Sequence, residues 1–473
     1  MSIPALAGKR VTVMGLGLHG GGLATVHYLH RQGAIVTVTD LRSKEVLAPV
    51  LAQLPDSVTV VVGEHRMQDF ETADLVVKNP AVPRNVEYLA AAPAVTTDIS
   101  LFLAHWRGRL GASAGPLVAI TGTKGKSTTT AATAHILSSA FPGTRMGGNI
   151  TVSPLTFVDE LQPHDPVVLE LSSFQLGDML HCRQSNSGEG DILHPNLAPE
   201  VAIITSIFSD HQDYYHSMDA YVQDKHEVFH GITPSGLAII GNQPVWVPVL
   251  SGAAYARGAE QVSIGGVPEY SESVAHAGEP MRHAIALAAA ACIHLGMSPE
   301  QIHQQVSTFS GIPHRMEPLG SDATAIWFND TAATIPEAAL QAVQGLRQEH
   351  KTVVLIAGGS DKGLSLKPLI TAAQEVHDSG GTTVLLAGSA TDQLMPLLRA
   401  QKIAVSGPHN SIIDAVAYAH RFCTALGSPA PLAVVLSPGC ASFGMFKNEF
   451  DRGDQFREQV KKILPPVNAD TVA

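Results

Sequence analysis

The segment TGTKGKST, residues 121–128, constrains this chain more than any other feature. It follows an apolar stretch and precedes a helix-forming one, which is the context of a phosphate loop, where backbone amides surround phosphate groups. In such a loop Lys126 would meet the β- and γ-phosphates and Ser127 would bind Mg²⁺. The usual pattern GxxxxGK(S/T) is not met, because Ile120 stands where its first glycine belongs, so the shorter form of the loop is present. The other nucleotide-contacting residues predicted here are Gly122, Thr123, Lys124, Gly125 and Thr128.

Short apolar strands alternate with helical patterns along the chain, which predicts an α/β protein with parallel, doubly wound sheets. The strands are expected at residues 10–14, 35–39, 58–62, 74–77, 117–121, 167–169, 201–205, 352–357, 383–386 and 432–436. A single core rarely grows past roughly 250–300 residues, so 473 residues are expected to form two or three domains. The Gly-, Ala- and Ser-rich stretch 108–116 is interpreted as a linker, and the polar stretch 183–199 as a surface insertion.

Charge and cysteine content exclude several classes of function. A net charge of −12 and a pI near 6.0 argue against general binding to nucleic acids or anionic membranes, which need basic surfaces. The 4 cysteines form no CxxC pair and indicate neither a disulfide scaffold nor a thiolate metal site. The apolar run 284–293 is too short to cross a membrane. We therefore expect a soluble, cytoplasmic and monomeric protein that binds small molecules.

A glycine turn, GLGLHG at residues 15–20, follows the first predicted strand, and Asp40 ends the second. Glycines let the backbone approach a pyrophosphate at a helix N-terminus, and the acid can bind a ribose hydroxyl. The pattern fits NAD, another nucleotide such as a UDP-sugar, or a turn with a structural role only. The residues of the turn alone do not decide among these three.

Polar side chains also follow two other predicted strands. Glu170 lies at the end of the strand in LELSSFQL, and Asp210 and His211 come just past the strand at 201–205. Ligand sites of open parallel sheets lie at the carboxyl ends of the strands, so a carboxylate there could hold Mg²⁺. The alternatives are an ordinary acid at a strand end and a zinc site that would use His211 with His216 and His226, although no known zinc spacing supports it.

A lysine occupies an apolar face in the helix expected at residues 218–229. The apolar stripe consists of Met218, Tyr221, Val222 and Phe229, and Lys225 falls on it. Lysine is seldom buried without a partner, although its stem can extend toward water. Either a special chemical role or such an extended side chain would explain this position.

Taken together, these segments resemble the Mur ligases, which add amino acids to UDP-linked muramoyl precursors of the bacterial cell wall, and among them the D-glutamate-adding members. The matching segments are TGTKGKST, LELSSFQL, GGNI at 147–150, GIPHRME at 311–317 and LSPGCASFGMFKN at 436–448. The resemblance implies three domains. They are a Rossmann-like UDP-substrate domain at residues 1–111, a central P-loop ATPase-like domain with a mostly parallel sheet at 112–312, and a Rossmann-like amino-acid domain at 313–473.

The implied reaction transfers the γ-phosphoryl group of ATP to the carboxylate of UDP-N-acetylmuramoyl-L-alanine, and the amine of glutamate then attacks the acyl phosphate. The resemblance implies two Mg²⁺ ions, with Ser127 and Glu170 as ligands of the first and His211 of the second, and a Lys225 that CO₂ converts to a carbamate. The catalytic set is Lys126, Glu170, His211 and Lys225. The implied substrate contacts are Arg315 and Asp330 for ATP; Leu18, His19, Asp40, Arg42 and Asn149 for the UDP substrate; and Thr334, Lys362, Ser442 and Phe443 for the amino acid.

The chain departs from the family pattern at several positions. Ala332 replaces a frequent lysine, which removes one cation near the glutamate carboxylates, and Glu279, Pro280 and His283 replace usual adenine contacts. Gly444 and Glu449 stand at positions that are often Asp and aromatic. The alternatives are a Mur-like ligase for L-glutamate or another amino acid, a folylpolyglutamate synthase, an NAD-dependent oxidoreductase, and a nucleotide sensor without catalysis.

Overall fold

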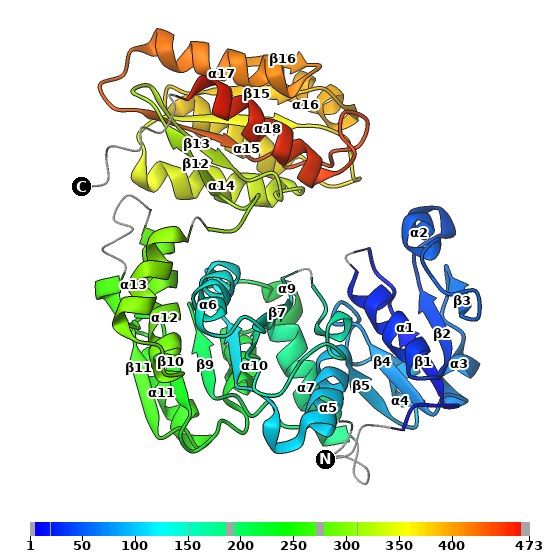
Figure 1. The fold of residues 1–473 in the computed structure, drawn as a ribbon. Coiled ribbons are helices and arrows are strands. Elements are labelled where there is room, and N and C mark those ends of the chain that lie inside the picture. Colours follow the sequence, from blue (N-terminus) through cyan, green and yellow to red (C-terminus); the bar gives the residue numbers. More distant parts are fainter. Residues whose placement is uncertain are drawn as a thin grey trace. The chain divides into compact units, whose positions relative to one another are not determined.

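The structure is a computed structural model that describes residues 5–18, 20–150, 152–185, 193, 195–270, 279–309 and 311–464. The chain divides into two compact units, residues 1–309 and 310–473, and contains three sheets with helices around them (Figure 1). This confirms the predicted α/β class. The domain boundaries expected at residues 111 and 312 stay predictions.

The first sheet has the strand order β3-β2-β1-β4-β5, and all its strand pairs are parallel. Its strands are β1 Arg10–Met14, β2 Ile35–Asp40, β3 Thr59–Val62, β4 Leu75–Lys78 and β5 Val95–Thr97. Its helices are α1 Gly21–Arg31, α2 Lys44–Leu51, α3 Met67–Glu71, α4 Glu87–Ala90 and α5 Asp98–Leu110. Side chains alternate between the two faces, so Val11 and Val13 pack toward α1 and α5, whereas Met14 packs toward α3 and α4.

The second sheet is also parallel, in the order β11-β10-β9-β6-β8-β7. Its strands are β6 Leu117–Thr121, β7 Arg145–Gly148, β8 Val167–Glu170, β9 Val201–Ile204, β10 Leu237–Ile240 and β11 Gln261–Ile264. Its helices are α6 Lys126–Ala140, α7 Ser173–Ser185, α9 Gln212–Tyr215, α10 Met218–His226, α11 Val247–Ala256, α12 Glu279–His294 and α13 Pro299–Thr308, with short 3₁₀ turns at η1 Gly111–Ser113, η2 Pro154–Thr156 and η3 Glu227–Phe229. Helices α6, α12 and α13 share one core with this sheet, and α7, α10 and α11 share the other.

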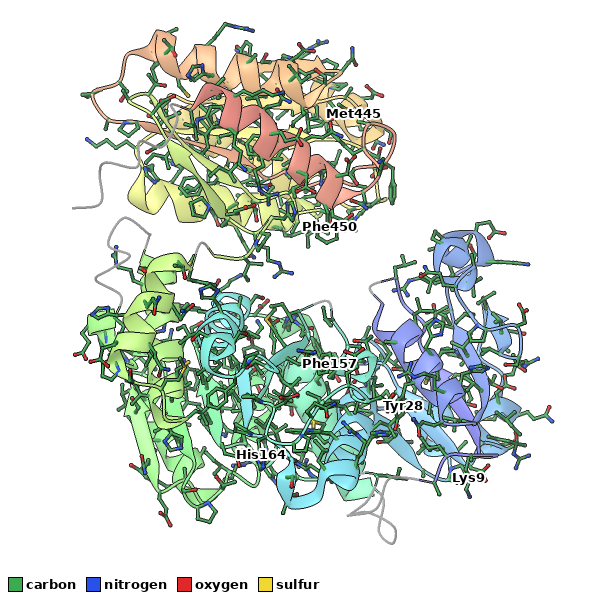
Figure 2. All side chains as sticks on the ribbon, in the orientation of Figure 1. Lys9, Tyr28, Phe157, His164, Met445 and Phe450 are labelled. Atoms are coloured by element: carbon green, nitrogen blue, oxygen red, sulfur yellow. The ribbon has the colours of Figure 1, made fainter. Side chains whose placement is uncertain are left out.

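One hydrophobic core runs from the first sheet to the second, because α5 is buried between them. Ile99, Phe102 and Trp106 of α5 belong to the same cluster as strand residues of both sheets. Figure 2 shows Tyr28 and Phe157 near this junction, and both side chains belong to that cluster. The two sheets therefore form a single unit, in which residues of the first can be placed against residues of the second.

The third sheet lies in the second unit and has the order β12-β13-β17-β14-β15-β16. Only its edge pair β12–β13 is antiparallel. Its strands are β12 Glu317–Ser321, β13 Ala325–Asn329, β14 Val353–Gly358, β15 Thr382–Leu386, β16 Val405–His409 and β17 Leu432–Leu436. Its helices are α14 Pro336–Glu349, α15 Lys367–Asp378, α16 Ser389–Ala400, α17 Ile412–Leu426 and α18 Glu449–Ile463. Helices α14, α15 and α16 share one core and α17 and α18 the other.

The interpretation of residues 108–116 as a linker is partly wrong, because α5 continues through Gly108 to Leu110. The helix ends instead at Gly111, whose φ of 57° is one that glycine adopts without strain. Residues 186–192 and 194 of the predicted insertion at 183–199 lie outside the described residues, and α7 extends into it as far as Ser185. Among the described residues, no helix is long and apolar enough to cross a membrane.

Candidate active site

The predicted phosphate loop lies between β6 and α6, beside the end of β9. Gly122 and Gly125 have φ angles of 147° and 81°. A Cβ atom on Gly122 would lie 2.0 Å from Thr205 Oγ1, so only glycine fits this close approach. Lys126 is the first residue of α6, so the backbone amides of the loop and of the helix N-terminus are available to an anion.

Lys126 lies among the carbonyl groups of its own loop. Its Nζ donates a hydrogen bond to the Thr123 carbonyl at 3.1 Å. Thr123 is itself held from outside the loop, because its N–H donates to the Ser206 carbonyl and its hydroxyl lies 3.0 Å from the hydroxyl of Tyr221. The loop is therefore fixed by both β9 and α10 before any nucleotide binds.

Glu170 ends β8, next to the phosphate loop strand, and is 2% exposed. Asn149 holds it, because its Nδ2 donates to Glu170 Oε1 at 2.9 Å and its backbone N–H donates to the Glu170 carbonyl at 2.8 Å. No hydrogen-bond donor of the described residues reaches the buried Oε2. Buried carboxylate oxygens normally have partners, so Oε2 fits the role of a ligand for a hard cation.

Lys225 lies on the apolar stripe of α10 and is buried, with 1% of its surface exposed, so its side chain does not extend to water. Its Nζ donates to the Gly122 carbonyl at 2.8 Å and lies 4.6 Å from the ring centre of Tyr221. The pKa of Lys225 is well below its usual value, first because burial removes water from the ammonium and second because Lys126 brings another positive charge close. The amine is therefore readily neutral, which is the form that reacts with CO₂.

His211 stands at the edge of this group and keeps a half-exposed side chain. Its backbone adopts a φ of 52°, and its ring packs edge-on against Phe174 with 4.9 Å between the centroids. The ring centre of Tyr221, which also contacts Lys225, is 6.3 Å away. The first unit thus brings together the phosphate loop, Glu170 and Lys225, with His211 beside them.

The magnesium ligands predicted from the sequence do not form a simple carboxylate cluster. Within the part of the chain that the structure describes, no three His, Cys, Asp or Glu side chains gather closely enough to hold a metal ion. The predicted set instead consists of the Ser127 hydroxyl, the Glu170 carboxylate, the His211 imidazole and a carbamate on Lys225. Three of these four groups offer oxygen, which suits Mg²⁺, and the bare Oε2 of Glu170 is the structural observation that supports the fit.

At the first sheet, Asp40 fixes the glycine turn. Its Oδ2 accepts from the Gly17 N–H at 3.0 Å and from the Arg42 guanidinium at 3.3 Å, and its Oδ1 accepts from the Arg42 N–H at 2.9 Å. Leu18 is 44% exposed on this turn, and the predicted contact His19 lies outside the described residues. The sequence predicted Asp40 as a ribose contact, and the structure adds that it positions both the turn and Arg42.

The predicted adenine region is described only in part. His283 Nε2 lies 3.2 Å from the Thr205 carbonyl, at the end of β9 beside the phosphate loop. Glu279 and Pro280 are the other departures from the family pattern. The structure describes their backbone in α12 but not their side chains. His283 is therefore the one of these three residues whose side chain can be placed near the nucleotide loop.

In the second unit, the end of β13 carries Asp330. Its Oδ2 accepts from the Ser437 hydroxyl at 2.7 Å and its Oδ1 from the Met316 N–H at 3.2 Å. Burial raises the pKa of Asp330 to about 6, and these hydrogen bonds oppose the rise. Arg315, the other predicted ATP contact of this unit, lies within electrostatic range of the same carboxylate.

The predicted amino-acid contacts come from three loops of the second unit, which follow β13, β14 and β17. Lys362 Nζ donates to the Thr334 hydroxyl at 3.0 Å, Ser442 is buried and Phe443 is 67% exposed. Arg452, which the sequence did not single out, is fully buried. It joins the loops after β13 and β17 by donating to the Thr331 hydroxyl and carbonyl and to the Cys440 carbonyl. An arginine on the apolar face of α18 was the signal that could have revealed it.

A second group missed from the sequence lies between the first two sheets. Lys78, Arg84, Asp178 and Asp224 form buried ion pairs there. Lys78 ends the otherwise apolar strand β4, which could have suggested a buried partner, but nothing in the spacing indicated which acids would meet it.

Comparison with known proteins shows the family of this chain. The model of the Mur ligase middle domain matches residues 120–277, and that of the MurD-like N-terminal domain of Mur ligases matches residues 9–100. The UDP-N-acetylmuramoylalanine--D-glutamate ligase of Roseiflexus sp. (strain RS-1) is 38% identical over 492 residues, which cover 97% of this chain and 99% of that protein. The chain belongs to the Mur ligase family. The resemblance seen in the sequence motifs is thereby confirmed.

Other relatives of this Mur ligase carry the same name. The UDP-N-acetylmuramoylalanine--D-glutamate ligases of Borreliella burgdorferi (strain ATCC 35210 / DSM 4680 / CIP 102532 / B31) and Treponema pallidum (strain Nichols) are each 34% identical, with 95% and 97% of this chain and 97% and 98% of those proteins covered. Among solved structures, the UDP-N-acetylmuramoylalanyl-D-glutamyl-2,6-diaminopimelate--D-alanyl-D-alanyl ligase from Acinetobacter baumannii has a TM-score of 0.51 at 17% identity over 90% of each chain. That likeness shows the shared fold.

Proposed function

We propose that this Mur ligase uses ATP to join D-glutamate to UDP-N-acetylmuramoyl-L-alanine, a step in the synthesis of peptidoglycan precursors. The observation that carries the proposal is the buried group in the first unit, in which Lys225 donates to the phosphate loop and Glu170 presents a bare oxygen. The full-length relatives named as D-glutamate ligases support the choice of amino acid. An NAD-dependent oxidoreductase would need no phosphate loop, and a sensor without catalysis would not need Lys225.

In this mechanism the first unit performs the phosphoryl transfer. The loop amides and Lys126 bind the phosphates of ATP and stabilise the negative charge that develops on the transferred group. Ser127, Glu170, His211 and a carbamate on Lys225 would hold magnesium, and the bound ion would neutralise phosphate charge. Asn149 keeps Glu170 in its orientation through two hydrogen bonds. The γ-phosphoryl group passes to the substrate carboxylate, and ADP is the leaving group. The amine of D-glutamate then attacks the acyl carbon, and inorganic phosphate and a proton leave as the amide forms.

The second unit supplies the amino acid in this proposal. Lys362 and Thr334 are hydrogen-bonded to each other, so a glutamate carboxylate can meet a hydroxyl and an ammonium at one place. Ala332 stands between Thr331 and Thr334 and contributes no charge. Lys362 therefore carries more of the carboxylate recognition than it would beside a second lysine.

We predict that Lys362→Ala raises the KM for glutamate by roughly 10–100-fold, because a hydrogen bond to a charged group is worth about 1.5–3 kcal/mol. The KM for ATP should change far less. Lys367→Ala is a matched control, because Lys367 is an exposed lysine of the same unit at the start of α15. Steady-state phosphate release with each substrate varied in turn measures both constants. Equal increases in the two KM values would assign Lys362 another role.

The amino acid itself is tested by phosphate release with ATP, UDP-N-acetylmuramoyl-L-alanine and one amino acid at a time. D-glutamate should support turnover and L-glutamate should not. Faster turnover with L-glutamate or another amino acid would replace the proposed substrate while leaving the ligase assignment intact. The cytoplasmic location and the monomeric state expected from the sequence stay predictions, and gel filtration of the purified chain tests the second.

A further inference from the structure

Arg84 reaches from the first sheet into the helices of the second. It lies in the segment after β4, and its Nε donates to Asp178 Oδ1 of α7 at 2.8 Å. Its Nη2 donates to Asp224 Oδ2 of α10 at 2.5 Å. One guanidinium therefore joins the first sheet to two helices that pack against each other.

The acids that Arg84 contacts are almost entirely buried and have further partners. Lys78 Nζ lies 2.5 Å from Asp178 Oδ2, and the Tyr215 hydroxyl donates to Asp224 Oδ2 at 2.9 Å. Asp178 and Lys78 are 2% exposed or less. Burying ions is costly, and apolar residues of similar volume are often as stable, so such a network is better explained by the geometry it specifies than by stability alone.

The ion pair between Arg84 and Asp224 requires a glycine at position 177 of α7. A Cβ atom on Gly177 of α7 would lie 1.9 Å from Arg84 Nη2 and 2.1 Å from Asp224 Oδ2. The pair thus crosses α7 directly over Gly177. Gly177 is not among the glycines with a positive φ, so its backbone does not require glycine. Because glycine is also a poor helix former, its presence in α7 is explained by the room that it leaves for the ion pair.

The network holds two helices that lie next to proposed magnesium ligands in the sequence. Asp224 directly precedes Lys225 in α10, and α7 begins three residues after Glu170. The other side of α10 is tied to the phosphate loop, through Lys225 to Gly122 and Tyr221 to Thr123. Helix α10 is therefore clamped between the phosphate loop and an arginine that belongs to the first sheet.

We propose that Arg84 is a positioning residue, which acts through Asp224 to hold the turn of α10 that carries Lys225 in place for phosphoryl transfer. The inference rests on the proposed role of Lys225. It also gives the domain that is proposed to bind the UDP substrate a direct mechanical connection to the catalytic lysine. Arg84 touches no reacting atom, so its loss should change kcat rather than the binding of ATP.

Gly177→Ala tests this by displacing the ion pair while every charged group stays in the chain. Gly252→Ala is the matched control, because Gly252 is also inside a helix and a Cβ atom there would meet nothing within 4 Å. We expect Gly177→Ala to lower kcat by roughly 10–100-fold, as small misplacements of catalytic groups do. Its affinity for ADP should stay near that of the parent, and Gly252→Ala should keep full activity. The melting temperature of Gly177→Ala should fall, because the displaced buried charges are less well paired, so kcat is measured far below that temperature.

Two outcomes of that comparison would overturn the inference. One is a Gly177→Ala enzyme with the parent's kcat, and the other is an equal loss of kcat in Gly252→Ala. Arg84→Gln, Asp224→Asn and the double variant give a second test that does not depend on Gly177. If Arg84 acts through Asp224, the double variant should be about as active as the less active of the two single variants. Losses of activity that multiply in the double variant would contradict the inference.

One further measurement separates this inference from the proposed function. The mass of the active parent enzyme, measured under native conditions, reports whether Lys225 carries a carbamate. An unmodified Lys225 in fully active parent would refute the proposed chemistry of the site. A carbamylated parent together with fully active Gly177→Ala would refute only the role of Arg84.

Discussion

Lys126→Ala is expected to remain folded and to lose roughly 10²–10³ in kcat, which is the usual effect of removing one preorganised group that stabilises transition-state charge. Lys126 begins α6, and its ammonium donates to the Thr123 carbonyl of the phosphate loop. The side chain is only partly buried, so its truncation should leave the fold intact. The loss should be seen in phosphate release under saturating concentrations of all substrates.

Lys44→Ala is a suitable control for this variant. Lys44 is also the first residue of a helix, α2, but it is exposed. Circular dichroism and melting temperature would establish that both variants are folded. Near-normal phosphate release by folded Lys126→Ala would refute the assignment of the phosphate loop, whatever the control shows.

The buried strands of this fold were predictable because their limits are set locally. Strands β1 and β6 lie within the predicted limits, since each is an apolar run that ends at a glycine turn. The end of α5 was not predictable in the same way. Gly108 signals a break by its low helix propensity, but burial of most of α5 between the two sheets stabilises the helix through that position.

The residues of the candidate site were predicted one by one from the sequence, but their contacts were not. An apolar stripe at helical spacing placed Lys225 on the buried face of its helix and left open whether its amine reaches water. The structure buries the side chain. That its amine meets the Gly122 carbonyl depends on how α10 packs beside β6, across 103 residues of sequence. Arg84 and Asp224 are 140 residues apart, and neither lies in a motif, so no local pattern indicates their pairing.

A carboxylate at the expected place can also have a second role that spacing does not reveal. Asp40 was expected from its distance to the glycine turn to contact a ribose. Both of its oxygens already accept hydrogen bonds, from Gly17 and Arg42, so it organises the turn as well. The spacing of a motif identifies a residue that could contact a ligand. Only the structure shows which groups of the protein, here Gly17 and Arg42, already bind the same carboxylate.

Lys225→Ala is expected to lose at least roughly 10² in kcat, comparable to removal of a preorganised electrostatic group. The physical reason is the charge that this position must carry. An ammonium close to Lys126 would repel magnesium, whereas a carbamate supplies oxygen ligands and offsets the charge of Lys126. The lowered pKa of Lys225 provides the neutral amine that this modification requires, because burial and Lys126 both disfavour the ammonium form.

Acetate should partly restore the activity of Lys225→Ala, because a small carboxylate can occupy the space beside Tyr221 and offer the oxygens that the carbamate would supply. Lys126→Ala is the matched control, since the group it lacks is a cation that acetate cannot replace. Bicarbonate should raise the activity of parent enzyme prepared without CO₂ and should leave Lys225→Ala unchanged. Normal activity of Lys225→Ala without acetate would refute the carbamate and would leave this lysine the structural role of a hydrogen-bond donor to the Gly122 carbonyl.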